Sequence, residues 1–178
     1  VLFVAVAALI FGRWDTSWVL DLGILTIGLA NTPLGWVFFA FSSVLTLFIA
    51  LFSLSYNDEA HHTGIAPLWM ILLASTVGIF FASDWIAFVI GWEIMGWTSF
   101  FIIAHGKERS YRASIYYYTL SLIGTATLLA AVFVVWRFTG TLSLDGSIAG
   151  LAVLWQSRPG VVYTVAILLT ITFFSKSA

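Results

Sequence analysis

The feature that most constrains this chain is the length of its apolar runs. Residues 33–55, PLGWVFFAFSSVLTLFIALFSLS, contain no charged side chain, and residues 111–138 carry charge only near their two ends. A helix needs about 20 apolar residues to cross the roughly 30 Å hydrocarbon core of a bilayer. Lipid offers no water to the backbone, so such segments must bond internally as helices. The sequence therefore predicts an all-α chain that crosses a membrane several times.

The composition supports a lipid environment. The chain is 61% hydrophobic and only 8% charged, whereas about a quarter of an ordinary soluble domain is charged. Its nine tryptophans and six tyrosines suit membrane interfaces. The formal charge of −1 gives no basic surface for nucleic acid, and the absence of cysteine excludes disulfides and iron–sulfur ligation within this chain. We therefore expect a lipid bilayer and no nucleic acid as its surroundings.

We predict one membrane domain over residues 1–178, a fragment of a longer chain, with about six hydrophobic segments. The segment 1–11 is about half as long as a span requires and is interpreted as a truncated helix. The last segment is likewise interpreted as truncated, by the chain end. Transmembrane helices are predicted over residues 33–55, 67–82, 84–104, 111–138 and 160–178.

Two segments predict structure outside the membrane. Residues 16–31 alternate in hydropathy around Gly23, which indicates a β-hairpin. Residues 148–155 are mildly amphipathic and predict a short surface helix. Asp84 directly precedes an apolar run and is expected to cap its helix. Basic residues favour the cytoplasmic side; their number is equal on the two sides, and only their density in the turn 107–112 favours that turn as cytoplasmic.

Glu93 is the first candidate for chemistry. It lies nine residues past Asp84, about 13 Å of helical rise, near the depth of the bilayer centre. Carboxyl groups at that depth are energetically unfavourable and usually mark proton or ion pathways. The alternative is a neutral glutamic acid hydrogen-bonded to a neighbouring helix. Gly91 and Gly96 flank Glu93 and predict close approach of a second helix, to which Thr98 and Ser99 can bond.

Lys176 is the second candidate. It lies about sixteen residues into the last apolar segment, again near mid-membrane depth. A lysine removed from water can exchange a proton with a neighbouring group, and a carboxylate nearby favours its charged form. The alternative is a lysine that extends its ammonium to an interface just past the chain end.

The histidines are weaker candidates. His61 and His62 are adjacent, but neighbouring side chains diverge and no third ligand is close in sequence, so we interpret them as part of a solvated loop and predict no metal site. His105 lies at the predicted cytoplasmic end of the Glu93 helix and is a candidate for proton entry.

Two motifs resemble a known family. Residues 80–103, FFASDWIAFVIGWEIMGWTSFFII, resemble the helix that bears the key glutamate in the antiporter-like subunits of respiratory complex I. The ending FFSKSA resembles the next landmark of that family, a lysine followed by Ser-Ala, and Lys176 matches that lysine. The family also supplies multi-subunit cation/proton antiporters and membrane-bound hydrogenases. The resemblance implies that Glu93 and Lys176 are proton-transfer partners on neighbouring helices.

The sequence also departs from the family pattern. Asn31 stands where many members have an aspartate before Pro-Leu-Gly, and Thr125 stands where some have a second acidic residue. Thr125 is therefore a candidate relay, and His105 is a second candidate because of its position at the end of the Glu93 helix. Family members are far longer, so the chain is expected to be the N-terminal part of such a subunit.

The resemblance implies a proton- or cation-translocating subunit of a larger complex, either a redox-driven NADH:quinone oxidoreductase or a related hydrogenase or antiporter. Its partners would be other integral membrane subunits, its ion H⁺ or Na⁺, and its site the bacterial or archaeal plasma (inner) membrane, ahead of an organellar inner membrane. Because the sequence contains no phosphate-binding or catalytic motif, we expect neither a catalytic site nor a cofactor in this chain.

Two alternative functions stay open. The first is a proton-coupled membrane partner of an inorganic-carbon uptake complex, which would co-purify with a soluble zinc-containing protein. The second is a scaffold that transports nothing, in which apolar side chains would seal Glu93.

Overall fold

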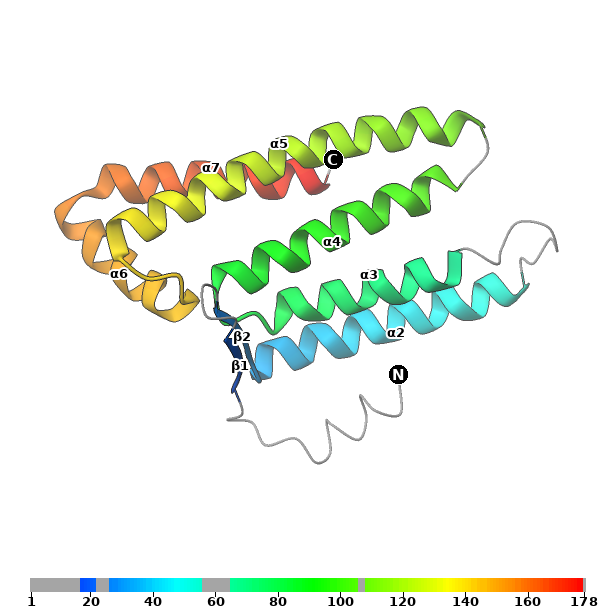
Figure 1. Cartoon of the computed structure of the whole chain (residues 1–178), viewed down its shortest axis with the longest axis horizontal. Coiled ribbons are helices and arrows are strands. Elements are labelled where there is room, and N and C mark those ends of the chain that lie inside the picture. The colour runs from blue at the N-terminus through cyan, green and yellow to red at the C-terminus, as the bar shows by residue number, and fades with distance from the viewer. Residues whose placement is uncertain (1–16, 22–25, 56–64, 106–107, 178) are drawn as a thin grey trace.

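The computed structural model describes residues 17–21, 26–55, 65–105 and 108–177. Helices dominate, with one two-stranded hairpin at one end of them (Figure 1). The elements in chain order are β1 (Ser17–Asp21), β2 (Thr26–Ala30), α2 (Pro33–Ser55), α3 (Ile65–Phe80), α4 (Trp85–Ala104), α5 (Glu108–Thr139), α6 (Leu144–Ser157) and α7 (Pro159–Ser177). The predicted all-α bundle with an added β-hairpin is confirmed.

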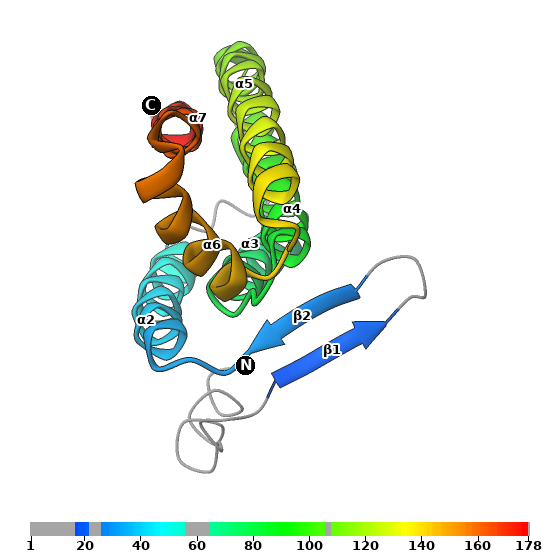
Figure 2. The same cartoon turned by 90° about the vertical axis from the view of Figure 1, so that its left-hand side faces the viewer.

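The long helices lie side by side. Each of α2, α3, α4 and α5 packs against the next in the chain, and neighbours run in opposite directions (Figure 1). Helix α7 packs along α5 and runs antiparallel to it, while α6 crosses one end of the bundle and contacts both (Figure 2). As a result, α5 has α4 on one side and α7 on another, and it joins the two helices that carry the ionisable candidates.

Within the described residues, four helices are long and apolar enough to cross a membrane: Pro33–Phe52, Trp85–Ala104, Ser110–Thr139 and Pro159–Ser177. The apolar stretch of α3, Pro67–Phe80, is shorter, yet α3 lies between α2 and α4 in the same layer (Figure 1). Large apolar side chains point outward from these helices, for example Phe41, 62% exposed, and Phe52, 67% exposed. Such a surface suits lipid or other apolar helices, and the chain is a multi-pass membrane protein.

Some helix bounds differ from the predicted ones. Helix α6 begins at Leu144, four residues before the predicted start, because Ser143 caps it by accepting a hydrogen bond from the Gly146 N–H at 3.2 Å. Helix α7 begins at Pro159, a residue suited to the first turn, where its missing N–H leaves no bond unmade. Helix α5 extends over Glu108–Thr139, beyond the predicted 111–138, because part of the charged turn before Tyr111 is helical and Thr139 continues the last turn.

The hairpin is joined to the start of α4. The N–H of Ala30 donates to the Phe81 carbonyl at 2.8 Å, and the N–H of Ser83 donates to the Gly28 carbonyl at 3.0 Å. A side chain at Gly28 would overlap Ser83, so glycine permits this close approach. On the other side, the Trp85 N–H donates to the Leu142 carbonyl at 2.9 Å. The turn that opens α4 is therefore bonded both to the hairpin and to the segment before α6.

Three predictions fall outside the described residues. These are the truncated helix over residues 1–11, the loop that contains His61 and His62, and the position of Lys107 in the basic turn.

Candidate functional site

Asp84 is the N-cap of α4. One carboxylate oxygen accepts a hydrogen bond from the Ala87 N–H at 2.7 Å, which satisfies a donor in the first helical turn. The other oxygen accepts from the N–H of Gly28 on β2. Since backbone donors hold both oxygens, Asp84 acts as a structural link between the hairpin and α4.

Glu93 lies in the middle of α4 and is half-buried. Its Oε1 accepts a hydrogen bond from the hydroxyl of Thr125 on α5 at 2.5 Å. The bond joins two helices that run in opposite directions, and it satisfies the carboxyl group at a depth where water is scarce.

Lys176 lies in the last turn of α7 and is also half-buried. Its Nζ donates a hydrogen bond to the hydroxyl oxygen of Ser121 on α5 at 2.9 Å. The same Nζ lies 5.0 Å from the centroid of the Trp92 ring and 5.9 Å from that of Tyr117. Both distances permit attraction between the ammonium and the negative ring faces.

The two ionisable groups are thus bound to one face of α5. Ser121 and Thr125 are four residues apart, so their side chains share a face about 6 Å apart along the axis. In the described part of the chain, Glu93 and Lys176 form no direct ion pair, and each is hydrogen-bonded to a hydroxyl group of α5. The resemblance implies that Glu93 and Lys176 are proton-transfer partners, which stays a prediction, and the structure places a hydroxyl of α5 against each of them.

Small residues bring these helices together. A Cβ added at Gly96 would lie 2.7 Å from the Lys176 Nζ and 3.2 Å from the Ser121 hydroxyl oxygen. A Cβ at Gly124 would overlap the Ser175 hydroxyl. One turn further along, the hydroxyls of Thr127 and Thr172 lie 2.8 Å apart and join α5 to α7. Close packing of α5 against α7 sets the position of Lys176.

The small and hydroxyl residues near Glu93 follow the sequence expectation only in part. Gly91 does approach a second helix, since an added Cβ would lie 3.2 Å from the Ser75 carbonyl oxygen of α3. The hydroxyls of Thr98 and Ser99, however, bond within α4 to the carbonyls of Ile94 at 2.6 Å and Met95 at 2.8 Å. In an apolar helix the carbonyl four residues earlier is the nearest acceptor.

His105 does not join the site. It is the exposed C-cap of α4, and its ring Nδ1 lies 3.2 Å from the Phe101 carbonyl oxygen. It lies about 18 Å from Glu93 along the helix axis. Among the described residues, no group of three or more His, Cys, Asp or Glu could hold a metal ion.

Ser121 is the site residue that the sequence reasoning missed. The available signal was its spacing, since Ser121 and Thr125 are hydroxyl residues one turn apart in an apolar helix. That spacing does not say which helix packs on the polar face. The position of Lys176 became apparent only from the packing of α7 on α5.

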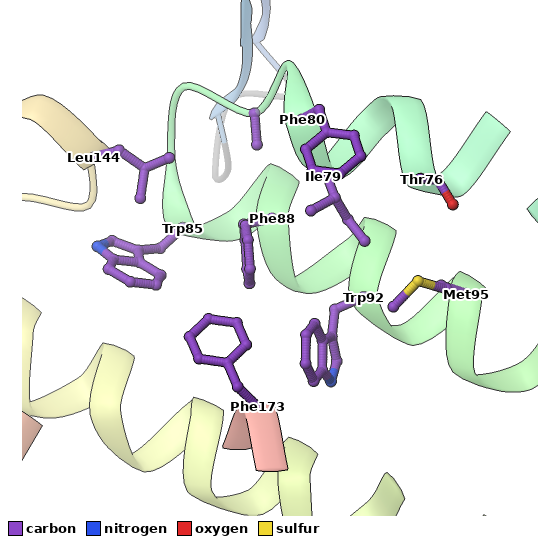
Figure 3. Close-up of a pocket in the computed structure, with 10 residues that line it drawn as sticks. Thr76, Ile79, Phe80, Trp85, Phe88, Trp92, Met95, Leu144 and Phe173 are labelled. Atoms are coloured by element: carbon purple, nitrogen blue, oxygen red, sulfur yellow. The ribbon is translucent and has the colours of Figure 1, made fainter. Parts of the chain in front are cut away.

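An apolar cavity of 460 Å³ lies beside the site, between α3, α4, α6 and α7 (Figure 3). Trp92 and Phe173 meet edge to face in its wall with ring centroids 5.8 Å apart (Figure 3). Because Lys176 lies over the Trp92 ring, this indole lies against both the apolar cavity and the ammonium. Trp92 is only 4% exposed, and no described residue accepts a hydrogen bond from its buried Nε1–H.

Comparison with known proteins decides the family. Residues 82–178 match the family described as NADH:quinone oxidoreductase/Mrp antiporter, transmembrane. The chain belongs to this family. Glu93, Ser121, Thr125 and Lys176 all lie in the matched region, and the resemblance noted in the sequence is confirmed.

Two curated members of the family align over most of this chain. The NADH-quinone oxidoreductase subunit N of Deinococcus radiodurans is 27% identical over 137 residues, which are 76% of this chain and 28% of that protein. The Na⁺/H⁺ antiporter subunit A1 of Staphylococcus epidermidis is 27% identical over 135 residues, which are 73% of this chain and 16% of that protein. The chain therefore spans less than a third of the length of either relative.

Solved structures support the fold. A chain of the Mrp complex from Dietzia sp. DQ12-45-1b superposes with a TM-score of 0.89 at 20% identity, covering 97% of this chain and 19% of that chain. A chain of the membrane-bound sulfane sulfur reductase, an archaeal respiratory membrane complex, superposes with a TM-score of 0.75 at 24% identity, covering 98% of this chain and 28% of that chain. Both matches belong to multi-subunit membrane complexes, and at these identities they establish the family fold alone.

Proposed function

We propose that this chain is part of a proton- or cation-translocating subunit of a multi-subunit membrane complex, and that Glu93 and Lys176 transfer the proton. The observation that carries the proposal is the placement of both groups against one face of α5, where Thr125 binds Glu93 and Ser121 binds Lys176. Ionisable groups inside membrane helices are energetically unfavourable, and where they occur they usually mark a proton or ion pathway.

The chemistry follows from the two charge states of the pair. With both groups ionised, attraction and hydrogen bonds compensate for the loss of water. If the lysine loses its proton or the glutamate gains one, the attraction is lost and one buried charge is left without a partner. A further proton transfer that neutralises this charge or restores its partner is then favoured. Moving the two groups together or apart therefore changes the affinity of each for a proton. The hydroxyls of Ser121 and Thr125 both donate and accept hydrogen bonds, so they suit a relay between the two groups.

The wider setting is proposed from the relatives. Their names describe an NADH-quinone oxidoreductase and a Na⁺/H⁺ antiporter, so we propose H⁺ or Na⁺ as the ion and other integral membrane subunits as partners. The energy source and any cofactor would reside in those partners. We propose the plasma membrane of a bacterium or archaeon as its location, and His105 as a proton-entry candidate at the end of α4.

The test is ion transport by the full-length chain in its assembled complex. In inside-out vesicles, proton uptake is followed with a pH-sensitive dye and sodium uptake with radioactive sodium. Glu93→Gln should reduce proton uptake at least tenfold at full assembly. The matched control is Asp145→Asn, because Asp145 is an exposed carboxylate in the first turn of α6. Unchanged uptake in Glu93→Gln would support a scaffold instead.

A further inference from the structure

The ammonium of Lys176 rests among uncharged groups, a position that a simple acid–base pair does not explain. We infer that Ser121, Gly96, Trp92 and Tyr117 form a docking niche for this ammonium, in which Gly96 and Ser121 lie about one helical turn from Glu93 and Thr125. In this inference Lys176 alternates between the niche and the carboxylate. The inference rests on the proposed function and adds the residues that hold the lysine when the ion pair is open.

The niche supplies several neutral contacts to the ammonium. Ser121 accepts a hydrogen bond from Nζ at 2.9 Å, and the Trp92 and Tyr117 rings lie 5.0 and 5.9 Å away. An ammonium has three donors, so one hydroxyl and two ring faces can bind it without a carboxylate. Ser121 is 4% exposed and Trp92 is equally buried, so these groups are fixed by packing.

Gly96 provides the room for the ammonium. Apart from the neighbouring residues and backbone of α4 itself, the described atoms that a Cβ at Gly96 would meet within 4 Å are the Lys176 Nζ and the Ser121 hydroxyl oxygen. At Gly91, in contrast, the added Cβ would meet the Ser75 carbonyl and the Ile79 side chain of α3. The space at Gly91 thus serves helix packing, whereas the space at Gly96 is taken up by the lysine.

Between α4 and α5, the Gly96–Ser121 part of the niche lies about one helical turn along from the Glu93–Thr125 contact. Gly96 follows Glu93 by three residues on α4, and Ser121 precedes Thr125 by four residues on α5. Because the two helices run in opposite directions, both steps lead the same way along the membrane, by about 5 Å. The flexible four-carbon stem of a lysine can cover such a distance by changing rotamers.

When Glu93 and Lys176 are not paired with each other, which we call the open arrangement, each of them still has a hydrogen-bond partner. Thr125 donates to Glu93 while Ser121 accepts from Lys176, so each charge has a hydroxyl partner when the direct pair is absent. The open and paired arrangements can therefore be close in free energy, and loss of one contact shifts their populations. Removing a hydrogen bond to a charged group is expected to shift the populations about tenfold.

The test perturbs the niche from two helices. Ser121→Ala removes the acceptor on α5, and Gly96→Ala places a Cβ against Nζ from α4 while keeping Ser121. In electron cryo-microscopy of the full-length complex, both variants should place the Lys176 Nζ within ion-pair distance of the Glu93 carboxylate. Proton uptake should fall about tenfold in both, because the paired arrangement is then favoured. Ser121→Thr keeps the hydroxyl and should retain more uptake than Ser121→Ala.

Two matched controls isolate the niche. Thr119→Ala removes an exposed α5 hydroxyl that bonds to its own helix at the Ile115 carbonyl. Gly78→Ala adds a Cβ to α3 where no described atom lies within 4 Å, apart from the neighbouring residues and backbone of α3 itself. If Nζ keeps its position in Ser121→Ala and Gly96→Ala, or if uptake in both equals that of the controls, the niche is refuted. Should Glu93→Gln nevertheless abolish uptake, the proposed function survives without it.

Discussion

Thr125 on α5 donates its hydroxyl hydrogen to Oε1 of Glu93 on α4 over 2.5 Å. This bond places a polar neighbour beside the carboxyl group from the helix that also binds Lys176 through Ser121. Helix α5 is therefore more than a spacer between α4 and α7, because its hydroxyls position both ionisable groups. The predictions below follow from this arrangement and from the contacts that hold it.

Thr125→Val removes the donor while keeping the shape of the side chain. We expect proton uptake by the complete complex to fall about tenfold, because a hydrogen bond to a charged group contributes roughly 1.5–3 kcal/mol. Thr125→Ser retains the hydroxyl and should recover most of the uptake. Vesicle assays of both variants at matched complex content measure this effect. Equal uptake in Thr125→Val and the unmodified complex would show that the bond plays no part.

Gly124→Ala tests the contact between α5 and α7. Its Cβ would overlap the Ser175 hydroxyl and lie 3.3 Å from the Thr172 carbonyl oxygen. We expect the purified complex to lose thermal stability, since overpacking of a close helix contact costs about 1–3 kcal/mol. The control is Gly160→Ala, where an added Cβ meets no described atom within 4 Å outside its neighbours and the backbone of its own helix. Identical melting temperatures for the two variants would contradict the packing described.

Asp84→Ala removes both bonds made by the cap of α4. The Ala87 and Gly28 N–H groups would lose their acceptors, and loss of an N-cap alone costs about 1 kcal/mol. Assembly of the complex should decrease, while uptake per assembled complex stays near normal because Asp84 does not contact Glu93. Asp84→Asn should assemble better, since asparagine also caps helices. Native gels and uptake assays measure the two effects, and normal assembly of Asp84→Ala would be the contrary result.

We expect an ordered water molecule beside the indole N–H of Trp92. Its buried Nε1–H has no acceptor among the described residues, and buried donors without protein partners usually bond to water. The indole also lies beside Lys176, so a water there would extend the polar path. A high-resolution cryo-microscopy map of the complex should show density about 3 Å from Nε1. An indole N–H enclosed entirely by carbon atoms would contradict this prediction.

The fold could be predicted well because its determinants are local. Apolar runs as long as Pro33–Ser55 fit a membrane only as helices, and alternation in residues 16–31 indicates the hairpin. Bounds such as the start of α6 were missed, because a serine cap extends the helix beyond its amphipathic part. The bonds between β2 and the turn before α4 join residues far apart in sequence, so no local pattern reveals them.

The candidate site was predictable only in part. The depth of Glu93 and Lys176 follows from counting residues along helices, and the two sequence motifs that resemble the family contain the same two residues. Which hydroxyl meets which charge depends on the rotation of α5 between α4 and α7. Thr98 and Ser99 looked equally suitable in sequence but bond within α4. The role of Ser121 depends on how α7 packs against α5, which the sequence does not show.

The most direct test of the central claim is a double-mutant cycle on proton uptake. The full-length complex is prepared with Glu93→Gln, with Lys176→Met, and with both changes. If the two residues act as a pair, each single variant loses at least tenfold in uptake and the double variant is no worse than the poorer single variant. Losses that simply multiply, or a single variant that transports normally at full assembly, would contradict the pair.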